Sequence, residues 1–156
     1  MARFSAQCKS AAALAVDTGF AWIFPTTAIG LKLRRVTLGV VAGATTPTSQ
    51  QVTVGIVRTT NSGTTPGGGM TAAKLDSNSA AASGVFSTTF ATPPTVAAAD
   101  GFRVTFNSQS GVDLPWELME EWLVPPAATA LGLAFINRDN ALPALHCYVL
   151  SIEWEE

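Results

Sequence analysis

The chain has 156 residues, the size of one ordinary domain with a single hydrophobic core. Only 13% of its residues are charged, its net charge is −2 and its mean hydropathy is +0.30, so we expect a neutral surface rich in hydroxyl groups. Such a surface favours burial against other chains over a free monomer. A pI near 5.3 argues against nucleic acid as a partner, and uncharged runs broken by Gly, Pro, Gln and Thr argue against membrane insertion.

The first residues are expected to belong to the mature protein, because the apolar run 11–16 is short for a signal peptide and ends at Asp17. Cys8 and Cys147 are predicted to be buried free thiols, since two cysteines in a domain of this size are more often reduced than paired. Together with two free thiols, the absence of an Asn-x-Ser/Thr sequence favours an intracellular origin.

Short segments rich in Val, Thr, Phe, Leu and Ile alternate with Gly, Pro, Asn and Ser, which is typical of an all-β protein. Eight or nine strands suit an antiparallel β-sandwich, which we expect to form one domain over residues 1–156, with a short N-terminal arm at 1–5. The predicted strands are 4–16, 20–24, 31–41, 51–59, 71–75, 85–91, 102–107, 128–136 and 145–154.

The third predicted strand changes phase in its middle. Leu31 and Leu33 share one parity, whereas the apolar residues from Val36 onwards share the other. An extra residue at Arg34-Arg35 would explain the change as a β-bulge. The alternative is a strand that begins only after this point.

Two segments do not fit the strand pattern. Residues 59–70 contain three successive glycines and no apolar side chain before Met70, so they predict a flexible surface loop. Residues 114–123 carry Trp116, Met119 and Leu123 at helical spacing, which favours a short helical turn over an extended segment.

The last predicted strand, 145–154, is apolar on both faces. His146, Tyr148, Leu150, Ile152 and Trp154 share one parity, and Leu145, Cys147 and Val149 share the other. A strand of this kind needs cover above and below, so we expect it inside a sheet, paired with the first strand.

Residues for catalysis are few. The single histidine, His146, is expected to be a packed side chain with one nitrogen satisfied, and no cofactor or metal motif is present. Asp113, Glu117, Glu120 and Glu121 are expected to form a solvated acidic edge, and a glycan-cleaving site on the first three ranks last among the functions considered. The four tryptophans fit core or interface positions better than a sugar-stacking groove.

The C-terminal third resembles small jelly-roll structural proteins of tailed bacteriophages. The likeness rests on a "LVVP"-like turn at 123–125, an apolar strand at 131–136, a short loop with Asn at 137–140 and a final strand ending in Trp154-Glu155-Glu156. The resemblance implies an eight- to nine-stranded jelly roll, with an immunoglobulin-like sandwich as the alternative fold.

The resemblance also implies a function without catalysis. It suggests a decoration or cement protein, assembled in the host cytoplasm, that sits as a homotrimer on the virion head and binds the major capsid protein. We assign Trp116, Trp122 and Trp154 to oligomer contacts, and Arg3 and Phe4 to the capsid contact. The alternative is a receptor-binding or carbohydrate-binding jelly roll of a tail fibre or spike.

Overall fold

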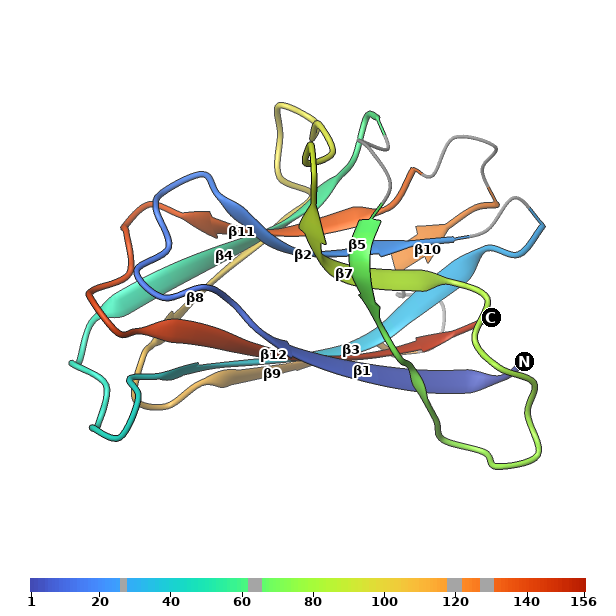
Figure 1. Ribbon diagram of the computed structural model, residues 1–156, viewed down its shortest axis with the longest axis horizontal. Coiled ribbons are helices and arrows are strands. Elements are labelled where there is room, and N and C mark those ends of the chain that lie inside the picture. The colour runs from blue at the N-terminus through green and yellow to red at the C-terminus, as the bar shows by residue number, and fades with distance from the viewer. Residues whose placement is uncertain (26–27, 62–65, 118–121, 127–130) are drawn as a thin grey trace.

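The computed structural model describes residues 1–156 except 26–27, 62–65, 118–121 and 127–130. The described part is an all-β sandwich of two antiparallel sheets packed face to face (Figure 1). It contains twelve strands: β1 (Arg3–Lys9), β2 (Gly19–Phe24), β3 (Leu31–Val41), β4 (Gln51–Arg58), β5 (Pro66–Met70), β6 (Ala73–Lys74), β7 (Val85–Phe90), β8 (Phe102–Asn107), β9 (Val112–Pro115), β10 (Trp122–Val124), β11 (Leu133–Arg138) and β12 (Cys147–Glu155). No helix long and apolar enough to cross a membrane occurs among the described residues.

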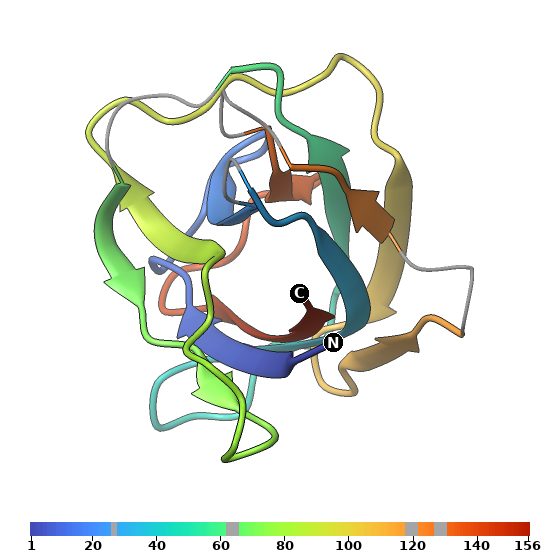
Figure 2. The same cartoon turned by 90° about the vertical axis from the view of Figure 1, so that its right-hand side faces the viewer.

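The strand order confirms the expected place of the last strand. Sheet A has the order β10-β3-β12-β1-β6, with β9 also paired to β3, and sheet B has the order β5-β7-β2-β11-β4-β8. The closing strand β12 therefore lies between β1 and β3 and not at an edge. In Figure 2 the two chain ends lie next to each other, and Ala2 and Glu156 exchange backbone hydrogen bonds of 3.1 and 3.0 Å.

Eight of the strands pair in a nested manner. The first, β1, pairs with the last, β12; β2 pairs with β11, β3 with β9, and β4 with β8, and every pair is antiparallel. The remaining strands extend the sheets: β5 and β7 continue sheet B beyond β2, β6 continues sheet A beyond β1, and β10 pairs with β3.

The predicted bulge is confirmed. Glu153 lies opposite Arg35 and Trp154 lies opposite Leu33, so Arg34 is the extra residue on β3 that the register with β12 skips. The bulge turns the side chains that follow it back to the inner face of the sheet. Leu33 and Val36 are therefore both completely buried although they lie three residues apart.

The core lies between the two sheets. The face of β12 that points into this core is closed more completely than the face that points outwards. The even-numbered side chains of β12, from Tyr148 to Trp154, are 0% exposed, whereas Val149, Ser151 and Glu153 on the outer face are half-buried. Within one chain only the inner face of β12 is fully closed, and cover of its outer face by a neighbouring subunit stays a prediction. On the outside of sheet B a smaller cluster, made of Trp22, Phe24, Val57, Ala134 and Ile136, packs under Phe90, Val96 and Ala97.

One buried amide holds the loops together where β11 ends. Asn137 is 0% exposed, and its side-chain nitrogen donates to the carbonyl oxygens of Leu14, Ala15 and Asn140 at 3.0–3.1 Å. Its Oδ1 accepts a 2.6 Å hydrogen bond from the Tyr148 hydroxyl. This side chain joins the β1–β2 and β11–β12 connections to the core.

Several expectations were wrong. Strand β1 ends at Lys9, not at residue 16, and it begins at Arg3, so most of the expected arm at 1–5 is paired sheet. The expected loop at 59–70 contains strand β5 from Pro66 onwards, and residues 62–65 lie outside the described part. The expected helical turn at 114–123 is contradicted at both ends by β9 and β10, and 118–121 are not described.

The connections 10–18, 42–50, 108–111 and 139–146 lie together at the end of the sandwich opposite the chain ends, at the left of Figure 1. We call this surface the loop end. Every residue in these four connections is described. All the positive backbone φ angles of the described residues fall here: Ala13, Asp17, Asp139 and Leu145, with Gly43 and Gly111.

Candidate functional site

Of the three tryptophans assigned to oligomer contacts, the structure leaves two available. Trp154 is 0% exposed, and its Nε1 donates to Glu156 Oε1 at 2.9 Å, so this residue belongs to the core and that assignment is wrong. Trp116 and Trp122 are half-buried at the surface, and Trp116 makes an edge contact with Phe102 at 6.1 Å between ring centroids.

Trp122 borders an open groove of about 520 Å³. The Arg58 guanidinium lies 5.6 Å from the centroid of the indole ring and donates to the Leu123 carbonyl at 3.1 Å. A Cβ at Gly101 would lie only 2.2 Å from the indole, so only glycine lets the ring come this close to the backbone. Leu123 is 54% exposed beside this ring, so the Trp122 groove offers apolar side chains to another chain next to the polar groups of Arg58 and Asp100.

The residues assigned to the capsid contact differ in exposure. Phe4 is 1% exposed, and its ring lies 5.8 Å from that of Trp154 in the core, so it has no surface to offer and the assignment is wrong. The Arg3 side chain is 52% exposed, and its Nε lies 3.1 Å from Glu155 Oε1. Arg34 contacts the same oxygen at 3.2 Å.

Of the candidate catalytic carboxylates, Asp113 is engaged by neighbours. Asp113 accepts hydrogen bonds from Arg35 Nε at 2.8 Å and NH2 at 2.6 Å, and from the Thr37 hydroxyl at 3.0 Å. Hydrogen bonding from Arg35 lowers the pKa of Asp113, which makes this carboxyl a poor proton donor. Glu117 is exposed, and Glu120 and Glu121 lie outside the described residues.

His146 is packed more tightly than the sequence indicates. It is 5% exposed, its Nε2 accepts the Thr48 N–H at 2.9 Å, and its Nδ1 lies 3.0 Å from the Ala144 carbonyl oxygen. The Nδ1 therefore carries the proton, and both nitrogens are used to hold backbone, where one satisfied nitrogen was expected. This imidazole has no free nitrogen for general base catalysis.

Both thiols are free and buried, as predicted. Cys8 pairs in register with Leu150 on the inner face, whereas Cys147 precedes Tyr148 and points to the other side of sheet A. The two sulfurs therefore lie on opposite sides of one sheet. Burial raises the pKa of Cys8 to about 12.

We expect neither thiol to react with a thiol reagent at pH 8 while the protein is folded, and both to react after unfolding in urea. The reason is that Cys8 and Cys147 are only 7% and 5% exposed, and the thiolate is the reactive form. Counting released chromophore without any reductant would give two thiols per unfolded chain. Rapid reaction of the native protein, or a count below two, would contradict this.

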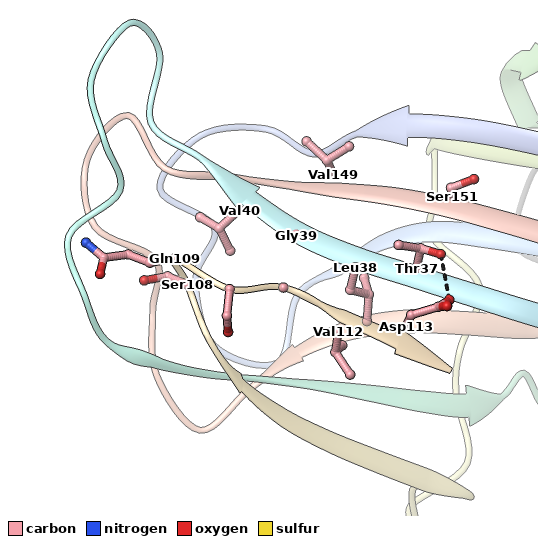
Figure 3. Close-up of a pocket in the computed structure, with 12 residues that line it drawn as sticks. Thr37, Leu38, Gly39, Val40, Ser108, Gln109, Val112, Asp113, Val149 and Ser151 are labelled. Carbon is pink, nitrogen blue, oxygen red and sulfur yellow. Dashed lines mark hydrogen bonds between the residues drawn. The ribbon is translucent and has the colours of Figure 1, made fainter. Parts of the chain in front are cut away.

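A second groove of about 500 Å³ lies on the outer face of sheet A, between β3, β12 and the β8–β9 turn (Figure 3). Gly39 forms part of its floor, and a Cβ at this position would have no neighbour within 4 Å. Val149, Ser151 and the Ser108–Asp113 segment line its sides. Asp113, joined to Thr37 by the dashed line in Figure 3, is the only charged residue of the lining. We call this the sheet A groove.

An ionic cluster crosses the outer face of sheet B. The Asp100 carboxylate, 8% exposed, lies 2.8 Å from Arg103 NH2 and 2.5 Å from Arg138 NH2. Arg138 also contacts Asp17, and Arg103 lies 3.1 Å from Asp139. A Cβ at Gly55 would lie 2.9 Å from Asp100 Oδ2, so glycine leaves room for this carboxylate. We call these five charged residues the charge network.

Comparison with models of known protein families, with curated proteins and with solved structures gave no match. The described residues also contain no group of three His, Cys, Asp or Glu side chains placed to hold a metal ion. The candidate sites that the geometry offers are three surfaces: the Trp122 groove, the sheet A groove and the loop end.

Sequence reasoning named Trp122 but missed its partners, because Arg58 at the end of β4 and Gly101 just before β8 are distant from it in sequence. It also missed Asn137 as a buried hub and Asp100 as a bridging carboxylate. A glycine opposite a charged residue, as Gly55 is to Asp100, gives no signal until the register is known.

Proposed function

We propose that the sandwich is a jelly roll. The nested antiparallel pairs, first strand with last and so on inwards, support this topology, in which a long folded-back ribbon of eight strands is rolled into two sheets. In an immunoglobulin-like sandwich the first strand pairs with the second, whereas here β1 pairs with β12 and β6.

We propose further that the protein is a non-enzymatic virion component that binds a bacteriophage capsid lattice as a decoration or cement protein. The nested strand order carries this proposal, because eight-stranded jelly rolls are common among capsid proteins. The resemblance of the C-terminal third, a sheet A groove with a single charged lining residue, and the engagement of Asp113 and His146 by structural neighbours support it. The partner is the major capsid protein, and the location is the head surface.

Cryo-electron microscopy of the purified virion tests this function. We expect density matching the sandwich on the outer head surface at threefold or quasi-threefold axes. Density confined to the tail, or the absence of the chain from the particle, would refute the proposal.

We expect a homotrimer held in part by the Trp122 groove. Replacing Leu123 with aspartate would place a charge in an apolar contact and reduce the measured mass in light scattering from about 49 kDa, three times 16.2 kDa, to that of one chain at micromolar concentration. The matched control is Leu75→Asp, since Leu75 is similarly exposed at 51% but distant in sequence. A wild-type monomer, or equal effects of both substitutions, would contradict the predicted contact.

The rival function is a carbohydrate-binding jelly roll, because this fold also occurs in lectin domains and the Trp122 groove combines an aromatic ring with polar side chains. A glycan array decides between the two. Binding of a defined glycan by the wild-type protein, lost in Trp122→Ala, would favour the rival.

A further inference from the structure

A side chain beside the chain ends binds the connection between β6 and β7. The Glu156 carboxylate accepts the backbone N–H of Ser83 through Oε2 at 2.7 Å and that of Gly84 through Oε1 at 2.8 Å. Its Oε1 also accepts the Trp154 indole N–H at 2.9 Å. Three neutral N–H donors therefore converge on one planar carboxylate, and hydrogen bonds to a charged acceptor are stronger than those to a neutral one. We call these three donors the carboxylate cradle.

Two donors of the carboxylate cradle are held in place by the rest of the fold. Trp154 is 0% exposed in the core. Gly84 directly precedes β7, whose first residue, Val85, pairs with Phe24. A Cβ at Gly84 would lie 2.9 Å from Glu156 Oε1, so glycine lets the carboxylate come this close to the backbone. These two N–H groups are therefore positioned for a carboxylate by contacts that do not involve Glu156.

The connection 75–84 crosses from sheet A to sheet B and runs beside the two chain ends (Figure 1). At its start the Leu75 N–H donates to the backbone of β1 at 3.0 Å. A local turn follows, in which the Asn78 N–H donates to Asp76 Oδ1 at 2.9 Å. The second half of the connection reaches the carboxylate cradle. We call residues 75–84 the strap.

The second half of the strap has little other hold on the core. Residues 80–83 are outside regular secondary structure, and their side chains are those of three alanines and a serine. Ala82 is partly buried against the core, whereas the other three residues are exposed. Burial of a single methyl group stabilises a segment only slightly. The hydrogen bonds to Glu156 are therefore the main contacts that fasten this part of the strap.

We infer that Ser83, Gly84 and Trp154 form a carboxylate-binding site with Glu156 as its tethered ligand, and that occupation of this site holds the strap closed. The backbone of Glu156 exchanges hydrogen bonds with Ala2, so its carboxylate is presented to the cradle at a high effective concentration. A small free monocarboxylate, for which acetate is the probe, therefore occupies the cradle only when the Glu156 side chain is removed.

Replacing Glu156 with alanine empties the cradle and should open the strap. Elastase cleaves after small residues, and proteolysis of a folded protein follows the population of the locally open form. We expect cleavage within 80–83 to be roughly tenfold faster than in the wild type, because hydrogen bonds to a charged group are lost. Cleavage at the exposed alanines 11–13, which mass spectrometry distinguishes, should be unchanged and serves as the internal control.

Acetate should close the strap again in Glu156→Ala. We expect cleavage within 80–83 to slow towards the wild-type rate as sodium acetate is added, whereas sodium chloride at the same ionic strength should not slow it. The Trp154 indole N–H resonance in NMR spectra reports binding without a protease. It should move in Glu156→Ala and return saturably towards its wild-type position with acetate. In the wild-type protein acetate should change neither measurement.

The matched control is Glu153→Ala, because Glu153 lies on the same strand with its side chain on the outer face of sheet A. Its strap should be cleaved at the wild-type rate. If Glu156→Ala does not fold, Glu156→Gln serves instead, since it keeps the volume but loses the charge, and its strap should also be cleaved faster. Equal cleavage of wild type and Glu156 variants, an equal effect of Glu153→Ala, or an indole resonance that acetate moves no more than chloride would overturn the inference.

Discussion

Replacing Asn137 with alanine is expected to lower the free energy of unfolding by about 3–5 kcal/mol. The substitution removes the donor to three carbonyl oxygens and the acceptor of the Tyr148 hydroxyl, and Asn137 and Tyr148 are 0% exposed. Water cannot replace these partners without opening the loop end. The Tm in thermal denaturation should fall by roughly 10 °C.

The matched control for this prediction is Asn140→Ala, because the Asn140 side chain is exposed and only its backbone carbonyl serves the hub. It should change stability by less than about 0.5 kcal/mol. Tyr148→Phe should lie in between, since it removes one hydrogen bond and keeps the ring that stacks on Phe20 at 4.9 Å. Equal stabilities of Asn137→Ala and Asn140→Ala would show that the amide does not hold the loops.

Replacing Asp100 with alanine is expected to cost about 3 kcal/mol of stability. The side chains of Asp100 and Arg138 are only 8% and 15% exposed, so removing the carboxylate leaves a largely buried guanidinium that keeps its ion pair with Asp17. The loss is measurable as a lower urea midpoint at pH 7. Asp139→Asn, at the exposed end of the charge network, is the control and should change stability by less than about 1 kcal/mol.

The same carboxylate should make stability sensitive to acid. Burial raises the pKa of Asp100, whereas hydrogen bonds from Arg138 and Arg103 lower it by a larger amount. The pKa of Asp100 therefore lies below its ordinary value of 3.8. The folded protein therefore takes up this proton at a lower pH than the unfolded chain. The contribution of the ionised Asp100 to stability is complete above the pKa of this group in the unfolded chain. It is lost as the pH falls through the pKa of the group in the folded protein. Urea midpoints between pH 7 and 3 should thus fall more steeply for the wild type than for Asp100→Asn, and parallel curves would contradict this.

The sequence was most informative where side chains alternate. The parity change at Arg34-Arg35 predicted the bulge because one buried face fixes the phase of every residue on a strand. The two apolar faces of 145–154 placed the closing strand inside a sheet for the same reason.

Strands without such alternation were missed. Three residues of β5 are glycines, so this strand rests on backbone pairing with β7, which periodicity cannot reveal. Strand β9 is only four residues long and is held to β3 partly by Arg35 and Asp113, a pair 78 residues apart. Its helical interpretation failed because tertiary pairing overrides a local spacing.

Site residues were predicted less well because residue type does not say which way a side chain points. Trp154 and Phe4 were assigned to contacts for their size and charge context, yet their parity with Ile152 and Ala6 would have placed them in the core. Leu145 has the opposite parity, and it lies in a turn with a left-handed backbone before β12 begins at Cys147. Backbone strain of this kind has no sequence signature at a leucine.

The nested pairing of the strands also sets the order in which the chain can fold. The inner pair, β4 with β8, is available long before the outer one, because β1 must wait for β12, more than a hundred residues later in synthesis. At about 5–20 residues per second this delay lasts on the order of ten seconds. During that time β1 has only the two-residue strand β6 as a native neighbour in sheet A, and pairings as distant as that with β12 fold slowly even in the complete chain. Until β12 has been made, the edge of β1 that β12 covers in the folded protein therefore stays open.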